Sequence, residues 1–207
     1  MSLRGLPGAA LRAVSRARLP IITIAATYLL TVIVGIGMAH AGNEFALSYR
    51  DNLVANAHRS DPASVAYRDD RPIEAAVWDF GRNLLLGAVP DTIAGVSVVA
   101  PYPLAASRGW VGGIVSVDAD HSSRFSDPFE AAYYASVIVL QLIPYSLAGG
   151  AGVNMGLGYF RPRPYYQGPR WMGIPREAIW DAARVYVFVV PLFLVASLWE
   201  FLSPWNR

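Results

Sequence analysis

Apolar and polar segments alternate along the chain on the length scale of membrane spans. Residues 21–39 form an uncharged apolar run, residues 131–160 carry no formal charge, and residues 178–202 are apolar with charges only towards the two ends. An α-helix rises about 1.5 Å per residue, so roughly 20 such residues match a ~30 Å hydrocarbon core. This pattern predicts an all-α, polytopic transmembrane helical bundle.

Two further apolar segments are interrupted or short. Residues 73–103 show helical apolar spacing at their start and then stay apolar except for Asp91. Residues 104–117 are too few for a full straight span, so this crossing is expected to be short or partly re-entrant and covered by protein or water. Prolines are expected to break or kink the first of these segments, at Pro90, Pro101 and Pro103.

The segment 131–160 is also expected to break. Its 30 residues would reach about 45 Å as one helix, which is too long for an untilted crossing. Pro144 and the glycines that follow it are the expected break points. About five crossings are therefore predicted, through residues 21–41, 73–103, 104–117, 129–158 and 178–202.

Arginine is unevenly distributed between the polar segments. The N-terminal tail (residues 1–20) and the loop 161–176 each hold four arginines and no acid, whereas segments 42–72 and 118–130 lean acidic. Basic segments stay on the cytoplasmic side of a membrane. The two basic segments are therefore expected inside and the two acidic ones outside.

This orientation divides the chain into five parts. A run of small residues at 39–42 also fits the cleavage site of a secretory signal peptide, but the apolar run before it exceeds the usual ~7–15 residues, which favours an uncleaved helix. The parts are a cytoplasmic tail (1–20), a first transmembrane helix (21–41), an extracytoplasmic loop with one helix around 44–58 (42–72), a transmembrane core (73–202) and an outer tail (203–207).

Composition supports a membrane protein and removes several kinds of chemistry. The 207 residues are 54% hydrophobic and only 15% charged, against about 25% charged in soluble domains. Cysteine is absent and every basic residue is arginine, which excludes disulfides, thiol catalysis, Schiff-base lysines and a Walker lysine. A net charge of +2 does not favour nucleic-acid binding.

Polar residues cluster just before the second apolar segment. Asp79 and Arg82 lie three residues apart, which places them on one helix face within ion-pair reach, and Asn83 follows directly. At the membrane edge this is an ordinary interfacial pair, the interpretation we favour. Deeper in the bilayer the same residues would be costly and would indicate function.

Three further polar residues lie in apolar surroundings. Asp91 follows Pro90 and is expected to cap a helix start, with an ion or proton step as the alternative. Gln141 is expected to hydrogen-bond another helix. Glu200 lies near the end of the last span, where contact with water would make it inexpensive.

Small residues recur at three- and four-residue spacing in residues 147–158. Such faces let helix backbones approach closely in lipid, so we expect a helix-packing or partner interface there. The residues that carry it are Ala148, Gly149, Gly152 and Gly156, with Gln141 one turn or more before them.

An outer-loop cluster is the one candidate for metal chemistry. Asp118, Asp120 and His121 stand together, and two carboxylates can bind a hard cation. A solvated acidic loop is the favoured interpretation. No hydrolase or metalloprotease motif is present, so we expect no catalytic, metal or cofactor site.

Several segments within about residues 73–202 resemble the stage II sporulation protein M family of integral membrane proteins. FGRNLLLGAV at 80–89 resembles its paired-asparagine entry with Arg82 in the first place, and SRGWVGG at 107–113 resembles its Asn-Gly turn with Arg108 in the Asn place. QLIPYSLAGGAGVNMG at 141–156 carries Gln141 where the family has glutamate, and REAIWDAAR…PLFLVASLWE at 176–200 matches at Glu200. These departures favour a divergent member kept for packing or assembly.

The resemblance implies a polytopic scaffold, or a part of an envelope-remodelling or export assembly, in the bacterial cytoplasmic membrane. We therefore expect a non-catalytic scaffold or accessory subunit. Its expected partners are membrane lipids and other membrane proteins or further copies of itself. The alternative is a transporter or channel component that uses the polar residues on broken helices.

Overall fold

The structure is a computed structural model that describes residues 5–161 and 163–205. The start of the predicted basic tail, including Arg4, and the last two residues of the predicted outer tail lie outside the described residues. The elements follow in the order α1 (Leu6–Arg16), α2 (Arg18–His40), α3 (Glu44–Ser60), α4 (Pro62–Arg68), α5 (Pro72–Gly81), the π-helical η2 (Arg82–Ala88), α6 (Val89–Ala94), the 3₁₀ turn η3 (Gly95–Ser97), α7 (Pro101–Ile114), the 3₁₀ turn η4 (Arg124–Ser126), α8 (Pro128–Phe160), β1 (Arg170–Trp171), β2 (Ile174–Pro175) and α9 (Arg176–Leu202).

The fold is all-α, as the apolar pattern predicts. Three helices, α2, α8 and α9, are long and apolar enough to cross a membrane, so the chain has the character of a membrane protein. The strands β1 and β2 form only a two-residue antiparallel pair. The helix expected around residues 44–58 is present as α3, and α4 follows it.

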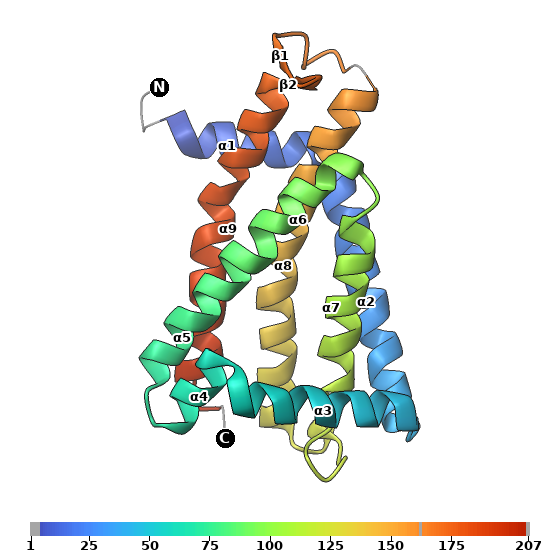
Figure 1. The fold of residues 1–207 in the computed structure, drawn as a ribbon, viewed down its shortest axis with the longest axis vertical. Helices are drawn as coiled ribbons and strands as arrows, with labels where there is room; N and C mark the ends of the chain where they lie inside the picture. The colour runs from blue at the N-terminus through green and yellow to red at the C-terminus, as the bar shows by residue number, and fades with distance from the viewer. Residues whose placement is uncertain (1–4, 162, 206–207) are drawn as a thin grey trace.

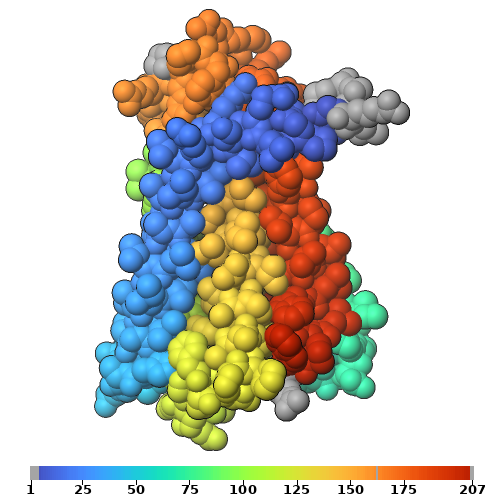
Figure 2. Space-filling view, turned by 180° about the vertical axis from the view of Figure 1, so that it is seen from behind, coloured from blue at the N-terminus to red at the C-terminus, as the bar shows by residue number. Residues whose placement is uncertain are grey.

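The long helices stand side by side and two shorter ones lie across their ends. The helices α2, α7, α8 and α9 follow the long axis of the molecule, and the continuous α5–η2–α6 run crosses them obliquely, while α1 crosses one end and α3 the other (Figure 1). Seen from behind, α8 lies between α2 and α9, and α1 passes over them (Figure 2). The long helices thus form one bundle with a shorter helix lying across each end.

The two ends of the bundle differ in charge. Helix α1 and the loop 161–176, which are rich in arginine, share one end, and the acidic segments 42–72 and 118–130 share the other (Figure 1). Arg16 of α1 donates a hydrogen bond of 2.8 Å to Asp181 of α9 and so fastens α1 to α9 at the basic end of the bundle. The arrangement agrees with the pairing of segments that the arginine distribution predicts.

The expected break in residues 131–160 is wrong, because α8 continues unbroken from Pro128 to Phe160. A proline inside a helix removes a single N–H donor, and Pro144 is buried among neighbouring helices that hold α8 straight through that point. The glycines after it are also buried against other helices. Tertiary packing therefore outweighs the local tendency of these residues to end a helix.

The expected break at Pro90 is also wrong. Helix continues from Pro72 through η2 to Ala94, and Pro90 lies where the wider π-helical turn of η2 passes into α6. The chain turns later, where Val98 adopts a left-handed backbone with φ of 68°. The next helix then begins at Pro101, as expected.

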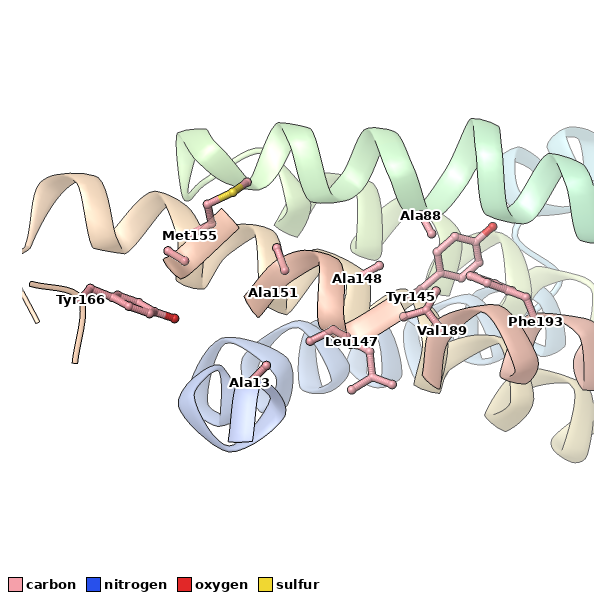
Figure 3. Packing of buried hydrophobic residues seen from close by; sticks show 13 residues of the cluster. Ala13, Ala88, Tyr145, Leu147, Ala148, Ala151, Met155, Tyr166, Val189 and Phe193 are labelled. Atoms are coloured by element: carbon pink, nitrogen blue, oxygen red, sulfur yellow. The ribbon is translucent and has the colours of Figure 1, made fainter. Parts of the chain in front are cut away.

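The main core lies where α8 packs against α9. The ring of Tyr145 meets the edge of Phe193 with centroids 4.8 Å apart, and Val189 is fully buried beside them (Figure 3). Alanines such as Ala148 and Ala151 fill the rest of the contact. Such small side chains bring the helix axes close together, which is how helices associate in lipid.

A second close contact joins α2 to α7, and our sequence analysis did not identify it. A Cβ atom on Gly109 would lie 2.2 Å from the carbonyl oxygen of Tyr28, and one on Gly113 would lie 2.2 Å from that of Val32. These distances are below any real contact, so the two helices touch through bare backbone. Helix α7 is thus held against α2 along its whole length.

Candidate functional site

A buried carboxylate organises the polar residues at the start of η2. Asp79 is 1% exposed and accepts hydrogen bonds from Arg82 Nη2, Asn83 Nδ2 and Ser197 Oγ, each at 2.8 Å. The expected pairing of Asp79 with Arg82 is therefore present. It is anchored to α9 through Ser197, which goes beyond an ordinary interfacial ion pair.

The π-helical turn η2 aims Asn83 into the bundle. Asn83 Oδ1 accepts a hydrogen bond of 2.8 Å from the hydroxyl of Tyr145 on α8. Wider turns of this kind are common at functional sites because they reorient side chains within a helix. The bond links the α5–α6 run to the centre of α8.

Asp91 is not a helix cap, which corrects the sequence prediction. It is 4% exposed and accepts two hydrogen bonds from the guanidinium of Arg108 on α7, one of them at 3.1 Å. Arg108 also lies 4.2 Å above the ring of Tyr145. A buried carboxylate needs such a partner, and only the antiparallel packing of α6 and α7 supplies it.

Gln141 and Glu200 meet across the interface between α8 and α9. Gln141 Nε2 donates to Glu200 Oε2 at 2.8 Å, so Gln141 bonds another helix as expected. The main-chain oxygen of Glu200 also accepts from the hydroxyl of Tyr133 at 2.7 Å. Glu200 is thus part of the bundle interior as well as the end of a span.

These residues surround a cavity of about 490 Å³ between the helices. Its wall includes two arginines, two carboxylates, two amides and three tyrosines, and both Asp79 and Asp91 stand directly behind the arginines. A volume of this size holds a small ligand. The polar lining residues are Tyr28, Asp61, Ser64, Arg82, Asn83, Ser107, Arg108, Tyr134, Gln141, Tyr145 and Glu200.

Helices α3 and α4 close one side of this cavity. Leu53 and Ala57 of α3 line it, and so does Asp61, the residue that joins α3 to α4. Asp61 accepts a hydrogen bond from Arg82. The segment predicted as an external loop is therefore a structured wall of the site.

The predicted small-residue face packs within this chain. Ala148, Gly149, Gly152 and Gly156 are all buried. A Cβ atom on Gly152 would lie 2.3 Å from the carbonyl oxygen of Thr92 on α6. This face is therefore covered by the chain's own helices and offers no surface to a partner.

The outer-loop cluster is held by local hydrogen bonds. Asp118 Oδ1 accepts from the backbone N–H of Asp120 at 2.9 Å, and His121 Nε2 lies 3.0 Å from Asp51 of α3. Hydrogen bonds from Arg50 and then from His121 lower the pKa of Asp51. Within residues 5–161 and 163–205, no three His, Cys, Asp or Glu side chains are grouped to hold a metal ion.

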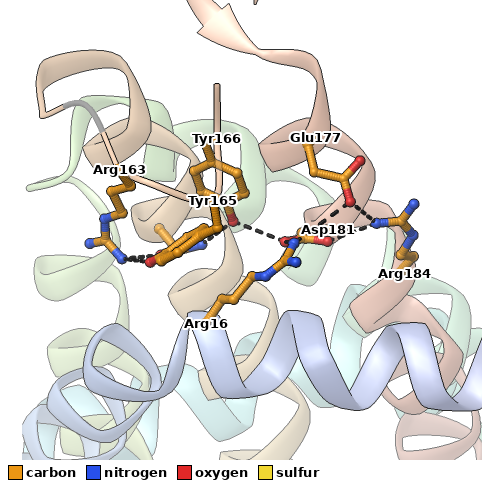
Figure 4. Close-up of polar contacts among 8 residues, drawn as sticks. Arg16, Arg163, Tyr165, Tyr166, Glu177, Asp181 and Arg184 are labelled. Carbon is orange, nitrogen blue, oxygen red and sulfur yellow. Dashed lines mark hydrogen bonds and ion pairs between the residues drawn. The ribbon is translucent and has the colours of Figure 1, made fainter. Parts of the chain in front are cut away.

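A second polar network fastens the opposite end of the bundle. Asp181 accepts hydrogen bonds from Arg16 of α1, from Arg184 on its own helix and from the hydroxyl of Tyr166 in the basic loop, at 2.8, 2.8 and 3.0 Å (Figure 4). Burial is the main cause that raises the pKa of Tyr166. Because it joins α1, the basic loop and α9 through one carboxylate, we assign this network to anchoring.

Several cavity-lining residues were not predicted as site residues from the sequence. Arg108 was noted only for its place in a family motif, and Asp61, Tyr145, Tyr28, Tyr134, Ser64 and Ser107 were not singled out. A signal for one of them was available, because Asp91 and Arg108 are single opposite charges in two neighbouring apolar segments. Asp61 and Tyr145 carry no such signal. Comparison with protein-family models, curated proteins and solved structures gives no match for this chain.

Proposed function

We propose that the chain crosses a bacterial cytoplasmic membrane five times, through α2, the α5–α6 run, α7, α8 and α9. The α5–α6 run extends without interruption from Pro72 to Ala94, roughly 34 Å of helix. The 14 residues of α7 reach only about 21 Å, but packing against α2 covers the backbone of this short crossing. The shared end of α1 and loop 161–176 supports a cytoplasmic N-terminus, with the C-terminus outside.

Within this membrane protein we propose a non-catalytic role in the passage of a small polar solute. The observation that carries the proposal is the cavity of about 490 Å³ lined by Arg82, Arg108, Gln141 and Glu200. Ionisable groups inside a membrane protein are costly and are retained where they line a pathway or a binding site. Here three ionisable groups and one amide converge from four different helices on one space.

The scaffold role expected from the sequence stays a prediction. One of the features that supported it, the small-residue face of α8, is covered by helices of the same chain. The likeness to the stage II sporulation protein M family also stays a prediction. Of the polar motif positions, Asn83 and Glu200 match the family and Arg82, Arg108 and Gln141 depart from it. All five line the cavity, which supports a functional site over a purely packing role.

Cysteine accessibility tests the proposal, because the natural chain has no cysteine. Ser107 lines the cavity, so Ser107→Cys places a nearly isosteric thiol in it. Leu30 on α2 is 63% exposed and points away from the bundle, so Leu30→Cys is the matched lipid-facing control. Each variant is treated with a charged, membrane-impermeant thiol reagent in right-side-out and in inverted vesicles.

A solute pathway predicts that Ser107→Cys reacts from both sides of the membrane, while Leu30→Cys reacts from neither. Thiolates form in water and not in lipid, so the control sets the background rate. Protection of Ser107→Cys on both sides would contradict the proposed pathway and would make the scaffold role the favoured function. Reaction from one side alone would indicate a receptor-like pocket and would contradict passage.

A further inference from the structure

Arg82 lies where the long-helix bundle meets the wall of the cavity that α3 and α4 form. Its guanidinium bonds Asp79 of its own helix run and Asp61 at the α3–α4 junction. The two carboxylates differ in setting, because the side chain of Asp79 is 2% exposed and that of Asp61 is 16% exposed. Asp79 is a fixed part of the bundle, whereas Asp61 comes from a peripheral segment.

Helix α3 is attached more lightly than α4. Within α3 only Ala46 and Arg50 are buried, and α3 meets the bundle through the rings of Phe45 and Tyr49 against Trp110 and through the exposed pair of Asp51 with His121. Helix α4 buries Ala63 and Ala66 and also meets the bundle through an edge contact between Tyr67 and Phe201. Segments with few buried contacts open at low free-energy cost.

We propose that a small organic acid binds in the cavity by placing its carboxylate on Arg82, where it replaces the carboxylate of Asp61. This inference rests on the proposed function, because it names the substrate class of the same cavity. The exchange keeps one fixed and one exchangeable carboxylate on the guanidinium. The number of carboxylates on Arg82 is unchanged, and the displaced Asp61 turns towards water as the end of α3 moves.

Charge and size limit the ligand to this class. On the guanidinium of Arg82 a phosphate group would place up to two negative charges next to Asp79, whereas one carboxylate of an organic acid places a single charge there, as Asp61 does. The forked guanidinium of Arg82 matches a planar carboxylate. The amides of Asn83 and Gln141 and the hydroxyl of Tyr28 line the remaining space and can bond the rest of a small acid.

Asp61→Asn is the sharpest variant, because it removes the competing charge and keeps the local fold. Asp61 caps α4 by accepting from the N–H and hydroxyl of Ser64 at 3.0 and 2.9 Å, and asparagine is an equally good cap. Asp69→Asn is the matched control, because Asp69 is an exposed acid at the other end of α4 that bonds Arg71 and not Arg82.

The experiment is calorimetric titration of the purified full chain in detergent with succinate, and separately with inorganic phosphate. We expect Asp61→Asn to bind succinate about two- to fivefold more tightly than the natural chain, the range that loss of a partly exposed ion pair allows. Asp69→Asn should bind like the natural chain. Arg82→Lys, which keeps the charge but not the fork, should bind at least tenfold more weakly.

A second measurement follows the displaced segment and does not depend on the stability of Arg82 variants. Spin labels on Asn56→Cys in α3 and Ala119→Cys in the outer loop report their separation by electron–electron resonance, and both positions are exposed. Succinate should shift the distance distribution of the labelled chain that keeps Asp61. The labelled Asp61→Asn variant should show the shifted distribution without succinate.

Succinate that binds no more tightly to Asp61→Asn than to the natural chain would overturn the inference, and so would tighter binding of phosphate than of succinate. An unchanged spin-label distance would do the same. These failures are distinguishable from failure of the proposed function. If Ser107→Cys reacts from both sides but the titration is negative, the organic acid is excluded as the ligand and the proposed pathway is retained.

Discussion

Replacement of Gly152 by alanine tests whether the small-residue face of α8 serves this chain itself. The added Cβ would lie 2.3 Å from the carbonyl oxygen and 2.8 Å from the Cα of Thr92 on α6. Both atoms are backbone, so no side chain can rotate to make room. The two helices must move apart by about 1 Å to restore ordinary contact distances.

The cost of Gly152→Ala can be built from its parts. Overpacking of a close contact costs about 1–3 kcal/mol. The separation also stretches the hydrogen bond of 3.0 Å from Thr92 Oγ1 to the carbonyl oxygen of Ala148, worth about 1 kcal/mol. Higher helix propensity returns up to about 1 kcal/mol. We expect the free energy of unfolding to fall by about 2 kcal/mol.

Gly37→Ala is the control for Gly152→Ala. Gly37 lies inside α2 and has nothing within 4 Å of an added Cβ. It should leave stability unchanged or raise it by up to about 1 kcal/mol through helix propensity. The assay is unfolding in mixed micelles with an increasing fraction of dodecyl sulfate, followed by circular dichroism, with oligomeric state measured by light scattering.

Two outcomes would refute this reasoning. If Gly152→Ala unfolds at the same detergent fraction as Gly37→Ala, the contact with Thr92 is not close in the membrane. If Gly152→Ala keeps its stability but dissociates an oligomer, the face of α8 serves a partner, as the sequence alone suggested. A loss of stability with no change in oligomeric state is the expected result.

Two further predictions concern ion pairs at different depths. Arg108→Met should lower the free energy of unfolding by about 3 kcal/mol because it leaves Asp91 buried without its partner, and Arg108→Met combined with Asp91→Asn should recover much of the loss in the same detergent titration. The second concerns Asp51, whose pKa is lowered in the folded chain by Arg50 and His121. A lowered pKa stabilises the fold above the unfolded pKa of about 3.9 and loses that contribution as pH falls further. The link from α3 to the outer loop should therefore loosen only below about pH 4, as seen in the spin-label distance between positions 56 and 119; loosening that begins at neutral pH would contradict this assignment.

The cavity changes how the intramembrane charges are understood. From the sequence, Asp79 and Arg82 fit an interfacial pair and Asp91 fits a helix cap. In the structure Asp79 is anchored to α9 and Asp91 to α7, and both arginines face one shared space. The carboxylates thus hold the guanidinium groups of Arg82 and Arg108 in fixed positions on the cavity wall.

Hydropathy and arginine placement determined the outline of this protein without any structure. The apolar runs at residues 21–39 and 185–199 mark the centres of α2 and α9 directly in the sequence. Charge predicts that α1 and loop 161–176 lie at the same end of the bundle, because a local excess of arginine favours one side of a membrane whatever the segment packs against. These properties are local, so sequence alone suffices for them.

Tertiary structure alone decided the continuity of α8 and the partners of its polar residues. Pro144 ends a helix in isolation, but surrounding helices that bury it on every side offset the cost of one missing hydrogen bond. Asp91 meets Arg108 across 17 residues and Gln141 meets Glu200 across 59. Such pairs form because helices approach through backbone contacts at glycine, and no local pattern records which faces will meet.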